Sequence, residues 1–201
     1  MIRLLLASAS PARRATLQAA GIDPLVAVSS VDEDAVLAAA GGVPPADAVL
    51  VLARAKAEDV ASTQAVAPDL VVLGCDSMLE LDGEVLGKPA DAADATARWR
   101  AMRGRAGVLH TGHWLVAGGG AVGATASTTV WFADVSDEEI DAYVATAEPL
   151  RVAGAFTVDG LGGPFVERIE GDHHNVVGLS LPLLRHLLAE VGVSVPDLWA
   201  R

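Results

Sequence analysis

The residue with the clearest chemical potential in this sequence is Asp76. It follows a continuous apolar run at residues 70–73, separated from it only by Gly74 and Cys75. Such a short apolar run predicts a buried strand, so the carboxylate is expected at the carboxyl end of that strand, where open α/β sheets bind ligands. A carboxylate there could act as a general base or hold a metal ion, but it could equally cap the following turn. Both interpretations stay open from position alone.

Lys56 is a second candidate because it lies within an apolar pattern. The 3.6-residue spacing of Val49, Leu52, Ala53 and Val60 predicts a helix over residues 44–62 with Lys56 in the middle of its apolar face. A lysine there either extends its ammonium group to water or meets an anion. The second alternative would place a cation beside a carboxylate or a phosphate.

Lys88 and Arg13 are further cations near predicted turns. If Asp82-Gly83 forms a two-residue hairpin turn, residue 81 pairs with 84 and residue 77 with 88, which brings Lys88 beside the Asp76 segment. Arg13 falls in the first turn of a helix predicted to begin with Ser10 as N-cap and Pro11 as first residue. It could bind phosphate oxygens with its guanidinium group, or it could be exposed.

An acidic run at residues 32–34 follows a predicted short strand at 25–28. Such a run is usually a solvated turn, but Asp32, Glu33 and Asp34 could also supply oxygen ligands to a hard cation such as magnesium.

The elements that would position these residues alternate between helix and strand. The predicted strands cover residues 2–7, 25–28, 70–73, 78–81, 84–87, 109–117, 121–133 and 164–169. The predicted helices cover residues 11–20, 44–62, 91–102, 136–146 and 181–191. Crossover and hairpin connections both occur, so the pattern predicts an α/β fold with a mixed sheet.

Composition narrows the function classes. The 201 residues are 52% hydrophobic and 20% charged, which is typical of a globular protein. A formal net charge of −12 disfavours a nucleic-acid polymer as partner, although a small phosphorylated ligand stays compatible. The single cysteine excludes an internal disulfide. The apolar opening run is too short to span a membrane and lacks a preceding basic region, so we expect a cytoplasmic protein without a membrane segment.

Six separated segments resemble one family, the Maf proteins, over essentially the whole chain. They are LASASPARR at residues 6–14, LARAKA at 52–57, GCDS at 74–77, LGKP at 86–89, AGAF at 153–156 and GDHHNVVGL at 171–179. Each segment is only modestly specific, and their order and spacing together carry the resemblance. It implies a single Maf-like domain over residues 1–201.

The resemblance implies a fold of the Maf and inosine triphosphatase type: a mixed, highly twisted sheet flanked by helices, in two lobes around a central cleft. It implies hydrolysis of nucleoside triphosphates between the α and β phosphates, to nucleoside monophosphate and pyrophosphate. It also implies a divalent cation, Mg²⁺ or Mn²⁺, and a role in nucleotide metabolism.

Roles carry over from the resemblance residue by residue. Asp76 matches the family's catalytic base and a metal ligand, and Glu33 matches an acidic residue near the metal. The phosphate-binding positions are Ser8, Arg13, Lys56 and Lys88.

Ala12, Ser77 and Asp159 match positions that the family uses to recognise the base. Here they depart from the family's usual residues, which leaves the preferred base open. Aspartate only accepts hydrogen bonds, so Asp159 would favour a base edge rich in donors.

Two other functions remain alternatives. A regulator of cell division could bind a nucleotide with little or no catalysis, and a simple phosphatase would release orthophosphate. The oligomeric state also stays open, and a homodimer is compatible with the sequence.

Overall fold

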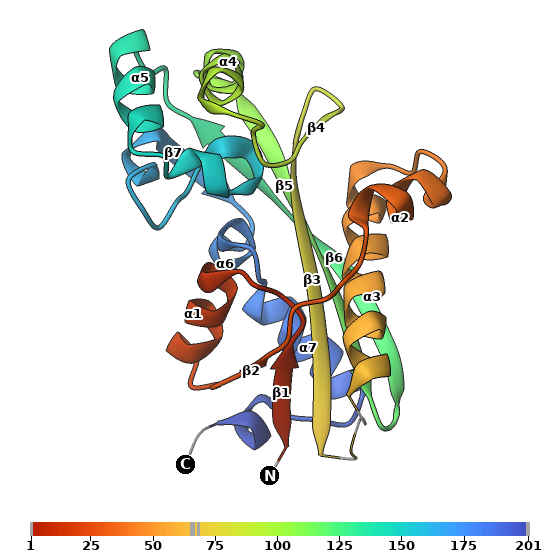
Figure 1. Cartoon of the computed structure of the whole chain (residues 1–201). Helices are drawn as coiled ribbons and strands as arrows, with labels where there is room; N and C mark the ends of the chain where they lie inside the picture. Colours follow the sequence, from red (N-terminus) through yellow and green to blue (C-terminus); the bar gives the residue numbers. More distant parts are fainter. Residues whose placement is uncertain (1, 65–66, 68, 200–201) are drawn as a thin grey trace. The chain divides into compact units, whose positions relative to one another are not determined.

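The chain is an α/β protein with a mixed sheet, as the sequence predicts. The computed structural model describes residues 2–64, 67 and 69–199. The strands are hydrogen-bonded in the order β2-β1-β3-β5-β6-β7, and β4 pairs with β3 (Figure 1). β1 pairs in parallel with both β2 and β3, whereas the β3–β4 and β6–β7 pairs are antiparallel.

The secondary structure alternates along the chain. The strands are β1 (Arg3–Leu6), β2 (Leu25–Val26), β3 (Leu70–Leu81), β4 (Glu84–Leu86), β5 (Ala106–Ala117), β6 (Gly120–Phe132) and β7 (Val166–Glu170). The α-helices are α1 (Pro11–Ala19), α2 (Glu33–Ala40), α3 (Pro45–Thr63), α4 (Ala92–Met102), α5 (Asp137–Ala145), α6 (His173–Val177) and α7 (Leu181–Glu190). Within the described residues, the short 3₁₀ helices are η1 (Pro149–Arg151), η2 (Ala153–Ala155), η3 (Gly163–Phe165) and η4 (Val195–Leu198).

These elements form two compact units. The first unit comprises Met1–Asp76, Thr111–Ala126 and Gly178–Arg201. The second comprises Ser77–His110 and Ser127–Val177. Among the helices that the structure describes, none combines the length and apolar character needed to cross a membrane.

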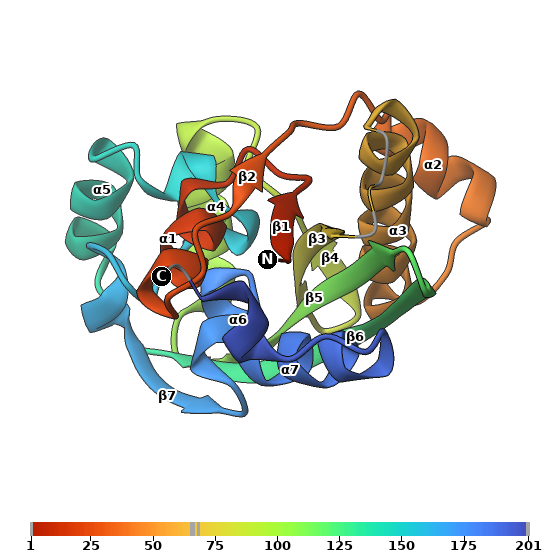
Figure 2. The same cartoon turned by 90° about the horizontal axis from the view of Figure 1, so that it is seen from below.

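In the first unit, helices cover both faces of β1 and β3. One set of alternating residues on these strands packs against α1 and α7 in a core that includes Leu6, Leu73 and Leu187. The opposite set packs against α3 in a second core that includes Val72 and Val60. Figures 1 and 2 accordingly show α1 and α3 on opposite sides of β1 and β3. Continuous apolar runs are what a strand with two buried faces requires.

The beginning of α1 follows its predicted capping. Ser10 has extended backbone angles, its side chain accepts a hydrogen bond from the amide of Arg13, and Pro11 is the first helical residue. Gly21 follows the helix with φ of +81°, a conformation that glycine adopts without a steric penalty. The predicted turn from strand to helix is therefore confirmed.

The prediction that a strand ends at residue 73 is wrong. β3 continues without interruption to Leu81, so Asp76 lies within the strand and not after it. Gly74 allows α3 to pack closely against this strand: a Cβ there would lie 2.1 Å from the carbonyl oxygen of Ala53. The residue is needed for this close approach between helix and strand.

The second unit contains the predicted hairpin. Leu81 pairs with Glu84, and Asp82 and Gly83 both have positive φ, as a two-residue primed turn requires. An apolar core surrounds Trp99 of α4, which makes edge contacts with Phe132, Tyr143 and Phe165. The tyrosine and all three phenylalanines of the chain thus lie in or against this core together with Trp99.

The other predicted elements agree with the structure to within a few residues, but α2 and α6 were not predicted. The capping box at Ser136 opens α5 as expected. The acidic run at residues 32–34 is not a solvated turn but the start of a helix, because Asp32 caps α2 and accepts from the amide of Ala35. β7 begins at Val166, since the preceding Pro164 belongs to η3.

Candidate active site

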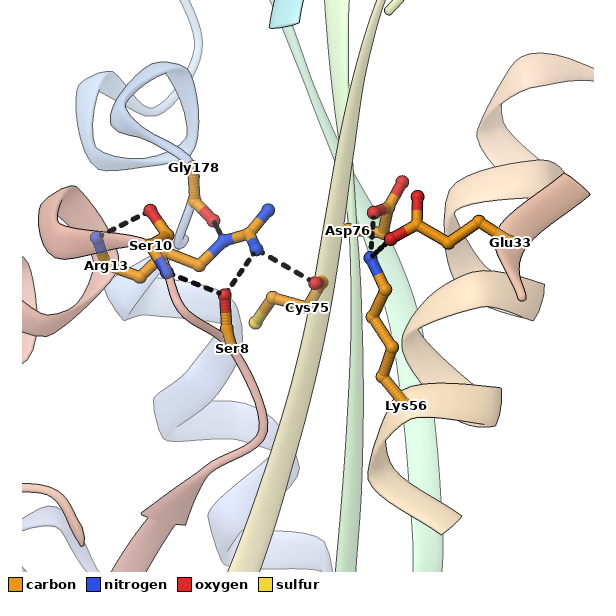
Figure 3. Close-up of polar contacts among 8 residues, drawn as sticks. All are labelled: Ser8, Ser10, Arg13, Glu33, Lys56, Cys75, Asp76 and Gly178. Atoms are coloured by element: carbon orange, nitrogen blue, oxygen red, sulfur yellow. Dashed lines mark hydrogen bonds and ion pairs between the residues drawn. The ribbon is translucent and has the colours of Figure 1, made fainter. Parts of the chain in front are cut away.

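Asp76 lies where β3 loses its parallel neighbour. The β1–β3 ladder ends at the pair Leu6 and Leu73, and the amide of Ala7 then donates to the carbonyl of Leu73. The carboxylate is therefore just beyond the carboxyl end of β1, although it lies inside β3. Its side chain is 11% exposed and projects toward α3, while Cys75 projects into the core on the opposite face (Figure 3). Open α/β sheets bind ligands at the carboxyl ends of their strands, and the strand that ends beside Asp76 is β1.

Lys56 meets an anion, which settles the two alternatives for this residue. Its ammonium nitrogen Nζ lies 2.6 Å from Oδ1 of Asp76 and 2.7 Å from Oε1 of Glu33. Lys56 comes from the apolar side of α3, and Glu33 is the first residue of α2. One buried ammonium group therefore bridges two carboxylates from separate elements (Figure 3).

The charges of this cluster do not cancel. Two carboxylates share one ammonium group, and Glu33 is 53% exposed while the other two side chains are buried. Burial raises the pKa of Asp76, and this effect outweighs the opposing attraction of Lys56 and Arg13. A raised pKa makes the ionised carboxylate a stronger base than an exposed aspartate.

Arg13 is buried, and hydrogen bonds to oxygen atoms hold its guanidinium group in place. Its Nε donates to the carbonyl of Gly178 at 2.8 Å, and its Nη1 donates to Cys75 O at 2.9 Å and Ser8 Oγ at 3.0 Å. The alternative of an exposed arginine is therefore wrong. The guanidinium group lies on the Cys75 side of β3, and its charge acts on Asp76 from there (Figure 3).

The turn between β1 and α1 is organised by two serines. Ser8 Oγ accepts from the amide of Ser10 at 3.2 Å as well as from Arg13. The first amides of a helix carry a partial positive charge and suit an anion. Ser8, Arg13 and the beginning of α1 therefore form one anion-compatible corner of the first unit.

The structure brings five of the predicted site residues together in the first unit: Ser8, Arg13, Glu33, Lys56 and Asp76. Ala12, also in this unit, is half-buried beside Arg13 in α1. Ser77 is the first residue of the second unit, and Asp159 is exposed within that unit.

Lys88 belongs to the second unit and is exposed. The predicted register of the hairpin is confirmed, but the ladder ends at the pair Leu79 and Leu86, so the expected pairing of Ser77 with Lys88 is not part of it. The reason is that the carbonyl of Gly87 accepts from the amide of Gly154 at 3.0 Å and from Arg98 Nη1 at 2.6 Å.

Sequence reasoning missed the backbone acceptors that orient Arg13. The carbonyl groups of Cys75 and Gly178 lie 62 and 165 residues away from it in the chain. A carbonyl carries no side-chain signature, so neither partner could be recognised from residue type. The only signal was that both residues fall within the segments that resemble Maf proteins.

The donor chemistry fits a hard divalent cation with only a few protein ligands. Among the residues that the structure describes, no three His, Cys, Asp or Glu side chains are grouped to hold a metal. Glu33 and Asp76 nevertheless place two carboxylate oxygens around one nitrogen. Magnesium is commonly bound in this way, by one or two carboxylates together with substrate phosphates and water.

Fold and site together describe an α/β protein with a buried carboxylate and two cations suited to an anionic ligand. Comparison with known proteins identifies the family: the model for the family described as Maf-like protein matches residues 3–191. This chain belongs to the Maf family.

Relatives along the whole chain support this assignment. A protein of Salinispora tropica named nucleoside triphosphate pyrophosphatase is 61% identical, covering 100% of this chain and 88% of its own length. A protein of Streptomyces coelicolor with the same name is 59% identical, covering 98% and 95%. The Ham1 protein of Staphylococcus aureus has a similar fold, with a TM-score of 0.50 and 13% identity over 98% of this chain and 93% of that chain.

Proposed function

We propose that this chain hydrolyses nucleoside triphosphates between the α and β phosphates and releases a nucleoside monophosphate and pyrophosphate. The observation that carries the proposal is the ion pair of the buried Asp76 and Lys56, with the more exposed Glu33 also on Lys56 and Arg13 across β3. The names of the relatives support the same reaction. We also propose that residues 1–201 are a single Maf-like domain.

Asp76 is the proposed general base. Its Oδ1 is engaged by Lys56, and its second carboxylate oxygen can accept a proton from a water molecule. The water oxygen then attacks the α phosphorus, and the bond from that phosphorus to the bridging oxygen breaks. The bridging oxygen leaves with pyrophosphate, and the proton taken by Asp76 returns to solvent. Because burial raises its pKa, Asp76 is better matched to this proton transfer than an exposed aspartate.

Lys56 and Arg13 would neutralise the polyphosphate. A triphosphate repels an incoming hydroxide, and fixed cations reduce that repulsion without reorganisation during the reaction. Arg13 is well suited because Ser8 and two carbonyl groups already hold its guanidinium group in place. Ser8 and Lys88 are further proposed phosphate contacts, and Ala12, Ser77 and Asp159 are proposed to contact the base.

A divalent cation, Mg²⁺ or Mn²⁺, is the proposed cofactor, and Glu33 and Asp76 would hold it together with the phosphates. When bound, such a cation withdraws charge from the phosphate oxygens and supports the leaving pyrophosphate. Glu33, the more exposed of the two, is the residue that can turn toward a cation entering with the nucleotide. We also propose that the protein works in the cytoplasm, and a homodimer stays a prediction.

The decisive experiment incubates the protein with a panel of nucleoside triphosphates and Mg²⁺ or Mn²⁺, and measures pyrophosphate and orthophosphate separately. Stoichiometric pyrophosphate and monophosphate, lost on adding a chelator, are expected. Release of orthophosphate without pyrophosphate would contradict cleavage between the α and β phosphates. Tight binding of a nucleotide without any product would favour the regulator.

A further inference from the structure

Glu148 of the second unit is the centre of a dense hydrogen-bond network outside the proposed catalytic cluster. It follows α5, and its carboxylate accepts from Tyr143 Oη at 3.0 Å and from Thr157 Oγ1 at 2.5 Å. It also accepts from the backbone amides of Leu161 at 3.1 Å and Gly162 at 3.2 Å. Hydrogen bonds to this one side chain thus hold both ends of the loop at residues 157–162 beside the end of α5.

Tyr143 closes the network from the other side. Its hydroxyl oxygen accepts from the amide of Thr157 at 3.2 Å while its hydroxyl group donates to Glu148. Burial raises the pKa of Tyr143 to about 12, so the hydroxyl group keeps its proton. Burial alone would raise the pKa of Glu148, but the donors, led by Thr157, outweigh it and lower that pKa. Both groups therefore stay in the protonation states that the network needs.

The loop packs against this network so closely that a Cβ at either of two glycine positions would force the network to shift. A Cβ at Gly160 would lie 2.7 Å from Glu148 Oε2, and a Cβ at Gly162 would lie 2.5 Å from Tyr143 Oη. The backbone of the loop is consequently specified by hydrogen bonds and by contact together.

Two side chains of the same loop project outward. Asp159 is exposed, and Leu161 is an apolar side chain with 59% exposure. An acceptor-only carboxylate repels phosphate, so this loop is unsuited to the polyphosphate end of a nucleotide. An acceptor beside an apolar side chain suits a nucleobase, which has apolar faces and polar donors at its edge.

We infer that Glu148 is a positioning residue that holds the loop at residues 157–162 so that Asp159 and Leu161 contact the nucleobase. The inference rests on the proposed function and deepens it, because it assigns base selection to a loop whose geometry depends on one carboxylate. Glu148 itself touches neither the base nor the phosphates. Pre-organising the loop reduces the ordering that binding would otherwise require.

The test compares a nucleotide with inorganic tripolyphosphate, which has the phosphate chain but no base. In Glu148→Gln, an amide NH₂ group replaces one acceptor of the network and opposes a donor. We expect the KM for the best nucleoside triphosphate to rise about tenfold with kcat nearly unchanged. The inhibition constant of tripolyphosphate should stay the same, and the differences among bases should shrink.

A second variant repeats this test, and a third serves as its control. Tyr143→Phe removes one donor and one acceptor, and should show the same pattern at about threefold in KM, even if Glu148→Gln fails to fold. Glu139→Gln is the matched control, because this carboxylate lies on α5 and accepts from the amide of Ser136 at the cap of that helix. It should leave the KM and the inhibition constant unchanged.

A general structural role would raise the KM and the tripolyphosphate inhibition constant together, and would overturn the inference. An unchanged KM in Glu148→Gln and Tyr143→Phe would overturn it as well. If the wild-type protein releases no pyrophosphate, the proposed reaction fails, and the same comparison is then made with dissociation constants for nucleotide and tripolyphosphate. A selective loss of nucleotide affinity would still support the role of Glu148.

Discussion

Asp76 in the first unit and Glu148 in the second are carboxylates whose pKa values are shifted in opposite directions. Asp76 is buried and receives a hydrogen bond from Lys56, and desolvation raises its pKa. Glu148 accepts four hydrogen bonds, led by Thr157, which overcome its burial and lower its pKa. The direction of a carboxylate's pKa shift therefore depends on the balance between desolvation, which prevails at Asp76, and hydrogen bonds to the charged form, which prevail at Glu148.

The comparison separates two uses of a negative charge. Lys56 donates to Oδ1 of Asp76, and the second carboxylate oxygen can accept a proton. Burying this charge lowers the stability of the folded chain. Four hydrogen bonds stabilise the charged form of Glu148 and hold the loop at residues 157–162 against it. Four predictions test this contrast, beginning with the one that has the largest effect.

Asp76→Asn should reduce turnover by about 10²–10⁴-fold, because the amide cannot accept the proton of the attacking water. The measurement is pyrophosphate release at saturating nucleotide, with nucleotide binding checked by calorimetry. Glu80→Gln is the matched control, since Glu80 lies on the same strand and its partner is His110. A rate for Asp76→Asn equal to wild type would remove Asp76 from the mechanism.

Lys56→Met should destabilise the folded chain by about 3 kcal/mol, because it leaves Asp76 buried without its cation. The measurement is the free energy of unfolding by denaturant titration. Arg54→Met serves as the control on the same helix, since its ion pair with Glu58 is about half exposed on both sides. That change should cost about 0.5 kcal/mol or less. Equal effects of the two substitutions would show that Lys56 is not a partner of a buried charge.

Arg13→Lys should raise the KM for nucleotide about tenfold, the equivalent of one charge-assisted hydrogen bond. Lysine keeps the charge but cannot reproduce the fork that contacts Ser8, Cys75 O and Gly178 O. Arg14→Lys, at the exposed neighbouring position, should have no effect on the KM. If both variants keep the wild-type KM, the orientation of Arg13 is irrelevant to binding.

The pH dependence of stability should differ in sign between the two carboxylates. The folded pKa of Asp76 is raised from 3.8, so its contribution lowers the free energy of unfolding as pH rises through the interval above 3.8. The folded pKa of Glu148 is lowered from 4.5, so its contribution is present above pH 4.5 and is lost as pH falls through the folded value.

Thermal melts of wild type, Asp76→Asn and Glu148→Gln between pH 3 and 7, roughly the range in which carboxylates titrate, measure this contrast. Compared with wild type, Asp76→Asn should gain in relative stability toward neutral pH, whereas Glu148→Gln should lose. Parallel curves for the two variants would contradict the opposite shifts.

The sequence predicted local structure well where neighbouring residues decide it. The Ser10 cap, the Asp82-Gly83 turn and the capping box at Ser136 are all formed as expected. Each depends on backbone angles or hydrogen bonds within a few residues. The continuation of β3 past Gly74 was missed, because it depends on the close approach of α3, far away in the chain.

The sequence proposed which residues belong to the candidate site, but little of how they are arranged. Lys56 was recognised as a cation within an apolar face, and the structure supplies its two partners. The acceptors of Arg13 and the network of Glu148 were not predicted. They involve carbonyl and amide groups, which every residue possesses, so no residue type marks them.

By itself, the sequence determined the order of most helices and strands, the mixed character of the sheet, and which charged residues could serve phosphate chemistry. These depend on periodicity, capping and residue type, which are local properties. Only the tertiary structure decided that Asp76 is withdrawn from water beside Lys56, and that Glu148 is saturated with donors. The pKa of a carboxylate depends on every group around it, and that set is assembled from distant parts of the chain.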